Sequence, residues 1–227
     1  MWHCSRNSSV LSMKVIIVLS CFILGAFSST KLDSNRYLDN LLQVPYPQYV
    51  RALGLTSINL SGFQLKVKKT SLSNRDLKAE FHNGKLTHPT LTRLGDCSAP
   101  GWQGTNVTLG CYLSLGSLRV EYNGTAKGDN VLATNKSIDL TAFFMGSKAF
   151  LEVTSAPGSV PTLKTWSVLP LNTQLFFSKK LDLNASRQTA FETEVKRNVV
   201  SATLSALYGG IQHALTSAVG VTKTPLP

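Results

Sequence analysis

The spacing of hydrophobic positions changes sharply near residue 185 of this chain. From about residue 58 to residue 183, apolar and polar residues alternate in short runs, as in Val107–Leu115, which is the two-residue period of half-buried β-strands. From Arg187 to Val219, apolar or small residues instead recur every three or four positions, the period of an amphipathic helix. At about 1.5 Å per residue, that helix would be roughly 50 Å long.

The surface of this long helix predicts how it is packed. No Asp, Glu, Lys or Arg occurs between Arg197 and Lys223, so the second half of the helix is weakly polar all round and should be covered on most sides. The alternation slips by one residue at Ser61-Gly62 and at Gly116-Ser117, as bulges in a curved sheet would require. We therefore predict an α+β fold in which a long curved antiparallel β-sheet wraps around a long C-terminal helix. Ser186 is the expected N-cap of the helix and Gly220 its end.

Two shorter signals complete the expected fold. Residues 34–42 predict a short N-terminal helix, because Tyr37, Leu38, Leu41 and Leu42 would share one face before the prolines that follow. Asn83-Gly84, between two alternating runs, predicts a tight hairpin turn.

The first 28 residues have the pattern of a secretory signal peptide. Arg6 and Lys14 precede the apolar run Val15–Phe27, and Ala26 and Ser28 are small residues at a cleavage-site spacing. A signal anchor is the alternative, but the run is short for a membrane span. We expect residues 1–28 to be a signal peptide, residues 29–221 a single domain and residues 222–227 a C-terminal tail.

The remaining cysteines and sequons fit an extracellular protein. Cys97 and Cys111 are the two cysteines outside the predicted signal, and an oxidising compartment favours one disulfide between them. Closing so short a loop is worth about 3 kcal/mol in the chain-entropy model. Five Asn-x-Ser/Thr sequons predict N-glycosylation near solvent. They are at Asn59, Asn106, Asn123, Asn135 and Asn184.

The chain is basic, with a formal net charge of +11, of which Arg6 and Lys14 contribute two. Such a charge favours anionic partners such as lipid headgroups, bacterial envelope lipids or sulfated glycans. Nucleic acid is not expected, because Lys/Arg runs do not exceed two residues and no pattern of stacking aromatics occurs. One basic stretch could bind phosphate or carboxylate headgroups, or could simply be a solvated strand face. It comprises Lys66, Lys68, Lys69, Arg75 and Lys78.

Catalytic chemistry has little support in the sequence. The chain has no Gly-x-Ser-x-Gly, His-Glu-x-x-His or Cys-x-x-Cys motif, and His82, His88 and His213 have no ligand spacing. The acidic residues are scattered. We expect no enzyme activity, no metal and no cofactor.

The order of elements resembles the tubular lipid-binding superfamily, which includes lipopolysaccharide-binding, juvenile-hormone-binding and takeout proteins and the mite group-seven allergens. The likeness is strongest to the mite allergens, and it rests on two segments, Ile58–Val67 and Val107–Tyr122. The resemblance implies a tubular domain that holds a lipid, and an arthropod secretion such as saliva. The chain departs from the takeout group, whose disulfide precedes the first strand.

If the domain is such a tube, its apolar residues either line a ligand site or form an ordinary packed core. Trp102, in the loop between the cysteines, either enters a membrane interface or covers the disulfide. The candidate tube-lining residues are Phe63, Leu65, Leu109, Leu113, Leu115, Phe143, Phe144, Leu151, Phe176, Phe177, Val199, Leu207 and Ile211.

We therefore expect a secreted, glycosylated, non-catalytic protein that binds a lipid or another hydrophobic small molecule, with an anionic membrane or envelope surface as a further partner. The alternative is a secreted interaction protein with a filled core, inhibitor-like, that binds a host protein or an anionic envelope or glycan. A lipocalin-type carrier is disfavoured by the length of the terminal helix. The sequence leaves the ligand and the oligomeric state open.

Overall fold

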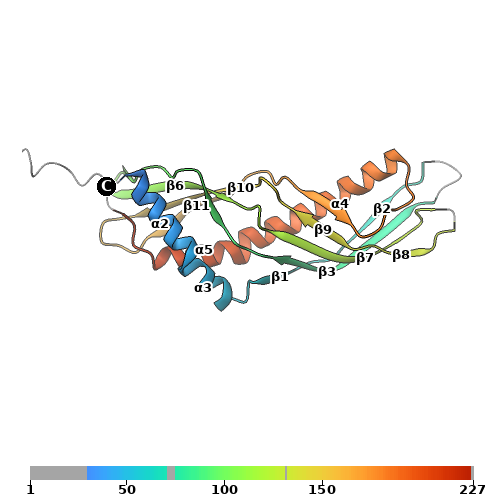
Figure 1. Ribbon diagram of the computed structural model, residues 1–227, viewed down its shortest axis with the longest axis horizontal. Coiled ribbons are helices and arrows are strands. Elements are labelled where there is room, and N and C mark those ends of the chain that lie inside the picture. Colours follow the sequence, from blue (N-terminus) through green and yellow to red (C-terminus); the bar gives the residue numbers. More distant parts are fainter. Residues whose placement is uncertain (1–29, 71–74, 131, 226–227) are drawn as a thin grey trace, which may run out of the picture.

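The computed structural model describes residues 30–70, 75–130 and 132–225, so the predicted signal peptide lies outside the described residues. The fold is elongated, with one long helical rod running along strands and two short helices crossing it near one end (Figure 1). The helices are α2 (Lys31–Gln43), α3 (Pro45–Ala52), α4 (Ala185–Ala206), a π-helical segment η1 (Leu207–Ile211) and α5 (Gln212–Gly220).

The strands form two antiparallel sheets instead of one. The larger sheet has the order β1-β3-β7-β9-β12, with β2 also paired to β3 and β8 to β7. Its strands are β1 (Ser57–Leu60), β2 (Phe63–Val67), β3 (Leu77–Thr87), β7 (Arg119–Lys127), β8 (Asn135–Ser137), β9 (Leu140–Phe143) and β12 (Gln174–Phe177).

The smaller sheet has the order β11-β10-β6-β4, with β5 paired to β6. Between β3 and β4 the chain leaves the larger sheet and enters the smaller one, and between β6 and β7 it returns. The strands of the smaller sheet are β4 (Thr92–Leu94), β5 (Gly101–Gln103), β6 (Asn106–Ser114), β10 (Lys148–Ser155) and β11 (Thr162–Val168).

Helix α4, the segment η1 and helix α5 follow one another without a break and form the C-terminal rod. The rod contacts both sheets, which confirms the predicted packing of a long helix along antiparallel strands. The α4 helix packs against β1 and β2, whereas α5 packs against β11 and against α3. Val195, Val199, Leu207, Ile211 and the apolar positions that follow in α5 have no exposed side-chain surface. Burying each such side chain stabilises the fold by about 1.5–3 kcal/mol.

The start of the rod and the bend within it lie at residues that the sequence analysis did not identify. The N-cap is Asn184, not Ser186: its Oδ1 accepts a 3.0 Å hydrogen bond from the backbone N–H of Arg187. Past the middle of the rod, Gly209 leaves helical geometry within η1, and the Trp166 Nε1–H donates to the Leu207 carbonyl at 3.2 Å. The helix ends at Gly220, as predicted.

The predicted slip at Ser61-Gly62 is the break between β1 and β2, which pair with successive parts of β3. The predicted hairpin turn at Asn83-Gly84 is wrong, because β3 continues through it. The register against β7 shifts between His82 and Lys85, and Asn83 has a φ of 53°. A Cβ on Gly84 would lie 2.3 Å from the ring of Tyr122, so this glycine serves tertiary packing within a bulge.

The N-terminal helix is confirmed and extends further than predicted. Tyr37, Leu38, Leu41 and Leu42 are all buried on α2. The proline after it does not simply stop the helix: Pro45 occupies the start of α3, where a missing N–H is tolerated.

The predicted disulfide between Cys97 and Cys111 is also present.

Gly124 of β7 provides a test of this packing. A Cβ there would lie 2.6 Å from Phe81 Cδ1 and 2.9 Å from the carbonyl oxygens of Glu80 and Ile138. We expect Gly124→Ala to lower the free energy of unfolding by about 1–3 kcal/mol, because these atoms would have to move apart. Urea unfolding measures the change, and Gly101→Ala in β5, where a Cβ meets nothing within 4 Å, is the control. Equal stability of the two variants would contradict the packing described.

Candidate functional site

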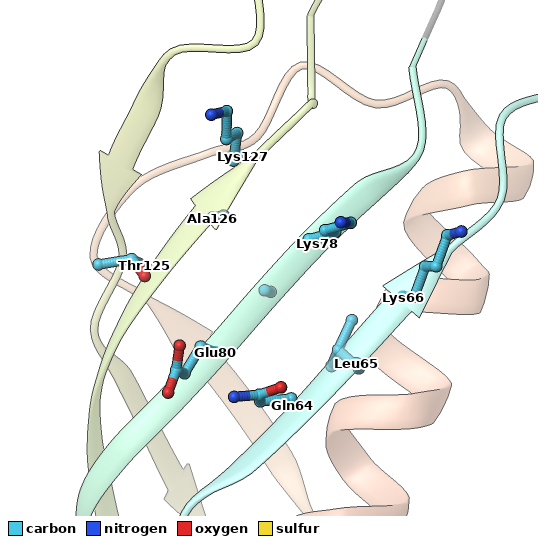
Figure 2. A pocket seen from close by; sticks show the side chains of 9 residues that line it. Gln64, Leu65, Lys66, Lys78, Glu80, Thr125, Ala126 and Lys127 are labelled. Atoms are coloured by element: carbon cyan, nitrogen blue, oxygen red, sulfur yellow. The ribbon is translucent and has the colours of Figure 1, made fainter.

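Three lysines stand in one row across the outer face of the larger sheet. Lys66 of β2 pairs with Lys78 of β3, and Lys78 pairs with Lys127 of β7. All three are exposed, while neighbouring Leu65 and Ala126 point into the core. Figure 2 shows the three lysines side by side across the strands. We call Lys66, Lys78 and Lys127 the lysine row.

The lysine row is poorly neutralised by its surroundings. Lys66 Nζ lies 2.7 Å from Asp76 Oδ2, but no ion pair to Lys78 or Lys127 occurs among residues 30–70, 75–130 and 132–225. Like charges placed directly opposite each other on adjacent strands destabilise a sheet. An anion bound over the row would relieve this repulsion, so the row has the chemistry of a phosphate, sulfate or carboxylate site.

Two shallow hollows meet at this row. The first, of about 470 Å³, contains Gln64, Glu80 and Thr125 as its polar floor beside the lysine row (Figure 2). The second, of about 420 Å³, shares Lys78 and Lys127 with the first and adds Lys69, Arg75 and Asp76. The two hollows together form one basic surface at the end of the β2–β3 pair.

The predicted basic stretch is therefore largely brought together. Lys66, Lys69, Arg75 and Lys78 line the hollows, whereas Lys68 is exposed but does not line either of them. Lys127 was missed by the sequence analysis, because only the pairing of β3 with β7 brings it beside Lys78.

A buried arginine holds the backbone behind the second hollow. Arg187, in the first turn of α4, is only 2% exposed, and its Nη2 donates to the carbonyl oxygens of Arg75 at 2.7 Å and of Gly128 at 3.1 Å. No carboxylate forms an ion pair with it in the described part of the chain. Its positive charge therefore adds to the potential of the basic surface from the protein side.

Two carboxylates, Asp129 and Asp76, form ion pairs with lysines at the same end of the sheet. The side chain of Asp129 has no exposed surface; it forms an ion pair with Lys136 of β8 and accepts from the Asp182 backbone N–H at 3.3 Å. Burial alone would raise the pKa of Asp129, but Lys136 and the backbone N–H groups of Asp182 and Asn130 outweigh it and lower the pKa. The Lys66 ammonium and the Lys69 backbone N–H likewise lower the pKa of Asp76.

The lowered pKa of Asp129 predicts how stability depends on pH. A carboxyl whose pKa is lower in the folded chain stabilises it fully above the unfolded value of about 3.9 and loses that contribution as pH falls through the folded value. We expect the free energy of unfolding to fall below about pH 4, and Asp129→Asn to be less stable at neutral pH with a shallower acid loss. Urea unfolding across pH measures both.

The control for that prediction is Asp139→Asn, since Asp139 is exposed. An acid loss in Asp129→Asn as steep as in the wild type would contradict the assigned role of this carboxylate.

The predicted tube-lining residues divide into three groups. Phe63 and Phe177 are partly buried and pack against the core. Phe143 and Phe176 do not face the interior: Phe143 lies outside on β9, and Phe176 is 55% exposed, with the two ring centroids 5.6 Å apart. The fully or nearly fully buried group is Leu65, Leu109, Leu113, Leu115, Phe144, Leu151, Val199, Leu207 and Ile211.

The alternation of side chains along β9 explains why Phe143 faces outward. On β9, Leu140 and Ala142 are the inward positions, so Phe143 has the outward parity, where the Arg119 guanidinium lies 5.7 Å from its ring centroid. A role of Phe143 and Phe176 in an internal ligand site is therefore withdrawn. The ligand-lining role of the other eleven residues stays a prediction.

Most of the other residues predicted to lie at the surface are exposed. Trp102 of β5 is 57% exposed and belongs to the smaller sheet, not to the sheet with the lysine row. Asn106 is partly buried, and the other four sequons, Asn59, Asn123, Asn135 and Asn184, are exposed. Their glycosylation stays a prediction. Asn135 pairs directly with Lys127 across β8 and β7, so a glycan there would flank the lysine row.

Among residues 30–70, 75–130 and 132–225, no group of three or more His, Cys, Asp or Glu side chains could hold a metal ion. His82, His88 and His213 are all exposed. Over the same residues, no helix combines the length and the apolar character that crossing a membrane needs.

The chain is similar to a known protein in sequence and to solved structures in fold. The chain is 23% identical over 217 residues to the salivary anticoagulant protein P23 of Ixodes scapularis, covering 93% of this chain and 97% of that protein. A crystal structure of lipopolysaccharide binding protein matches with a TM-score of 0.48 at 15% identity, covering 86% of this chain. This chain spans only 39% of that structure's chain. No protein-family model matches. The chain is thus similar, over nearly its whole length, to a salivary protein.

Proposed function

We propose that this chain is a secreted, non-catalytic binding protein that uses the lysine row to dock on anionic lipid headgroups. The observation that carries the proposal is the direct cross-strand alignment of Lys66, Lys78 and Lys127, of which Lys66 alone forms an ion pair within the described part of the chain. Three ammonium groups in one register row match a surface of closely spaced phosphates.

The strength of such docking can be estimated from the charges. Each basic residue near an anionic membrane surface contributes about 1 kcal/mol, and the attraction decays within a Debye length of about 8 Å at physiological salt. The lysine row with Lys69 and Arg75 therefore supplies enough attraction for reversible docking, without any inserted helix. The formal net charge of +11, of which Arg6 and Lys14 in the predicted signal peptide contribute two, also favours attraction to anionic surfaces.

An extracellular setting agrees with this role. The Cys97–Cys111 disulfide is typical of an oxidising compartment, and the relative P23 is by name a salivary protein. That relative is also named as an anticoagulant. We extend this to the present chain as a working role: binding without turnover would act by occupying a surface that a host reaction needs.

A second candidate is an inhibitor-like protein that binds a host protein and has a filled core. The packing around the rod favours it, since Val199, Leu207 and Ile211 have no exposed surface and pack in one cluster with both sheets. In this alternative the apolar interior is structural, and only the outer surface binds.

Vesicle sedimentation tests the first candidate. We expect the protein to bind phosphatidylcholine vesicles that contain phosphatidylserine and not vesicles of phosphatidylcholine alone, with affinity falling as salt is raised. Lys78→Ala should weaken binding about fivefold, and the triple variant of Lys66, Lys78 and Lys127 to alanine about a hundredfold or more. The matched control is Lys148→Ala, which removes one exposed lysine from the smaller sheet.

The outcomes are distinct. Unchanged vesicle binding by the triple variant, or equal binding to both vesicle types, would reject headgroup docking at the row. Because Asn135 lies beside Lys127, the protein should be compared with and without Asn135→Gln. Tight binding to a host clotting protein in the absence of any vesicle binding would instead support the inhibitor-like alternative.

A further inference from the structure

A separate hollow of about 490 Å³ opens beneath α3, away from the lysine row. Its floor is apolar and comes from Leu42, Tyr46 and Val50 of the N-terminal helices, with Pro47 and Pro89 at its sides. Its rim is made by Arg51, Thr56 and the segment 87–90, where the chain crosses between the two sheets. The volume lies within the usual range of small-molecule sites, about 300–1,000 Å³.

The wall formed by residues 87–90 is fixed before any ligand arrives. Tyr46 Oη donates to the Pro89 carbonyl at 2.7 Å, and the Thr90 N–H donates to the His88 carbonyl at 2.6 Å. Ser117 Oγ also donates to the carbonyls of this segment. A rigid wall costs a ligand little ordering free energy, so the hollow is preorganised.

This wall also contains unusual backbone. His88 has a φ of 55°, a left-handed conformation that costs a non-glycine residue energy. Such conformations persist only where the surroundings impose them, and they concentrate at binding sites. Here the conformation turns the chain around the mouth of an apolar hollow.

The fixed charge at this hollow is positive. Among the described residues that line it, Arg51 carries a full charge and none is acidic. Arg51 is exposed and has no ion pair among residues 30–70, 75–130 and 132–225. A guanidinium presents paired donors that match a carboxylate, and an apolar floor below it matches a hydrocarbon tail.

We propose that the hollow beneath α3 binds one small monocarboxylate amphiphile, such as a free medium-chain fatty acid, with its carboxylate on Arg51 and its tail against Leu42, Val50 and Pro89. This site is independent of the lysine row, because none of its residues lines either basic hollow. It takes a dissolved monomer, not a membrane surface.

Fluorescence titration with dansyl-labelled undecanoic acid, followed by displacement with decanoate, tests the site. We expect saturable binding to the full chain and displacement by decanoate but not by decanol, which lacks the carboxylate. Arg51→Gln should weaken the labelled acid about tenfold, since a charge-assisted pair is lost. Thr56→Trp should abolish binding, because an indole at this exposed rim position would fill the hollow.

The control is Arg36→Gln, which removes an exposed arginine from α2 without touching the hollow. Circular dichroism confirms that each variant is folded. The proposal is overturned if the wild type does not bind the labelled acid, if decanol competes as well as decanoate, or if both Arg51→Gln and Thr56→Trp bind like the wild type. Vesicle binding by Arg51→Gln should be unchanged, so failure here and failure of headgroup docking are separate results.

Discussion

The burial of one winding stripe on the C-terminal rod determines the rest of this architecture. Every fourth residue from Arg187 to Val219 is buried, without exception, across α4, η1 and α5. Four residues turn an ideal helix by about 400°, so a stripe with this spacing moves around the rod by about 40° at each step. No flat surface can follow such a stripe along its length, and the rod must be covered from successive directions.

The contacts of the rod follow from that geometry. Its first part meets β1 and β2 of the larger sheet, and its last part meets β11 of the smaller sheet and the α3 helix. Within η1, Gly209 and Gly210 lie where these partners change, and a Cβ on Gly210 would lie 2.7 Å from Leu55 Cδ2. The glycine at 210 therefore permits the close approach of Leu55 to the rod, whereas a Cβ on Gly209 would meet nothing within 4 Å.

The sequence predicted those features that local spacing determines and missed those that depend on distant pairing. Alternation identified the strands, and the three-and-four spacing identified the rod, because both signals lie within short windows. The division into two sheets depends on which strands pair, and the alternation in each strand is the same in either case. Asn83-Gly84 has the composition of a tight turn, yet the Tyr122 ring packs on Gly84 and keeps β3 continuous. Local turn chemistry was overridden by one tertiary contact.

The candidate site shows the same limit. Lys66, Lys69, Arg75 and Lys78 are close in sequence, so their clustering could be predicted; Lys127 and Arg187 reach the same end of the sheet only through the fold. Apolar character alone misplaced Phe143 and Phe176. The parity of β9, with Leu140 and Ala142 inward, could have assigned Phe143 to the outer face, whereas the run Leu175–Phe177 is apolar throughout and gives no parity signal.

Asn184, which caps the rod, is also the asparagine of a sequon, and the oxygen and nitrogen of its side-chain amide form separate hydrogen bonds. Asn184 Oδ1 accepts the Arg187 N–H, while Nδ2 donates to Thr70 Oγ1 at 2.9 Å. An oligosaccharide would be joined through Nδ2 and would leave Oδ1 chemically unchanged. The start of the rod can thus bear a sugar and keep its cap, with one amide hydrogen still present for the hydroxyl of Thr70.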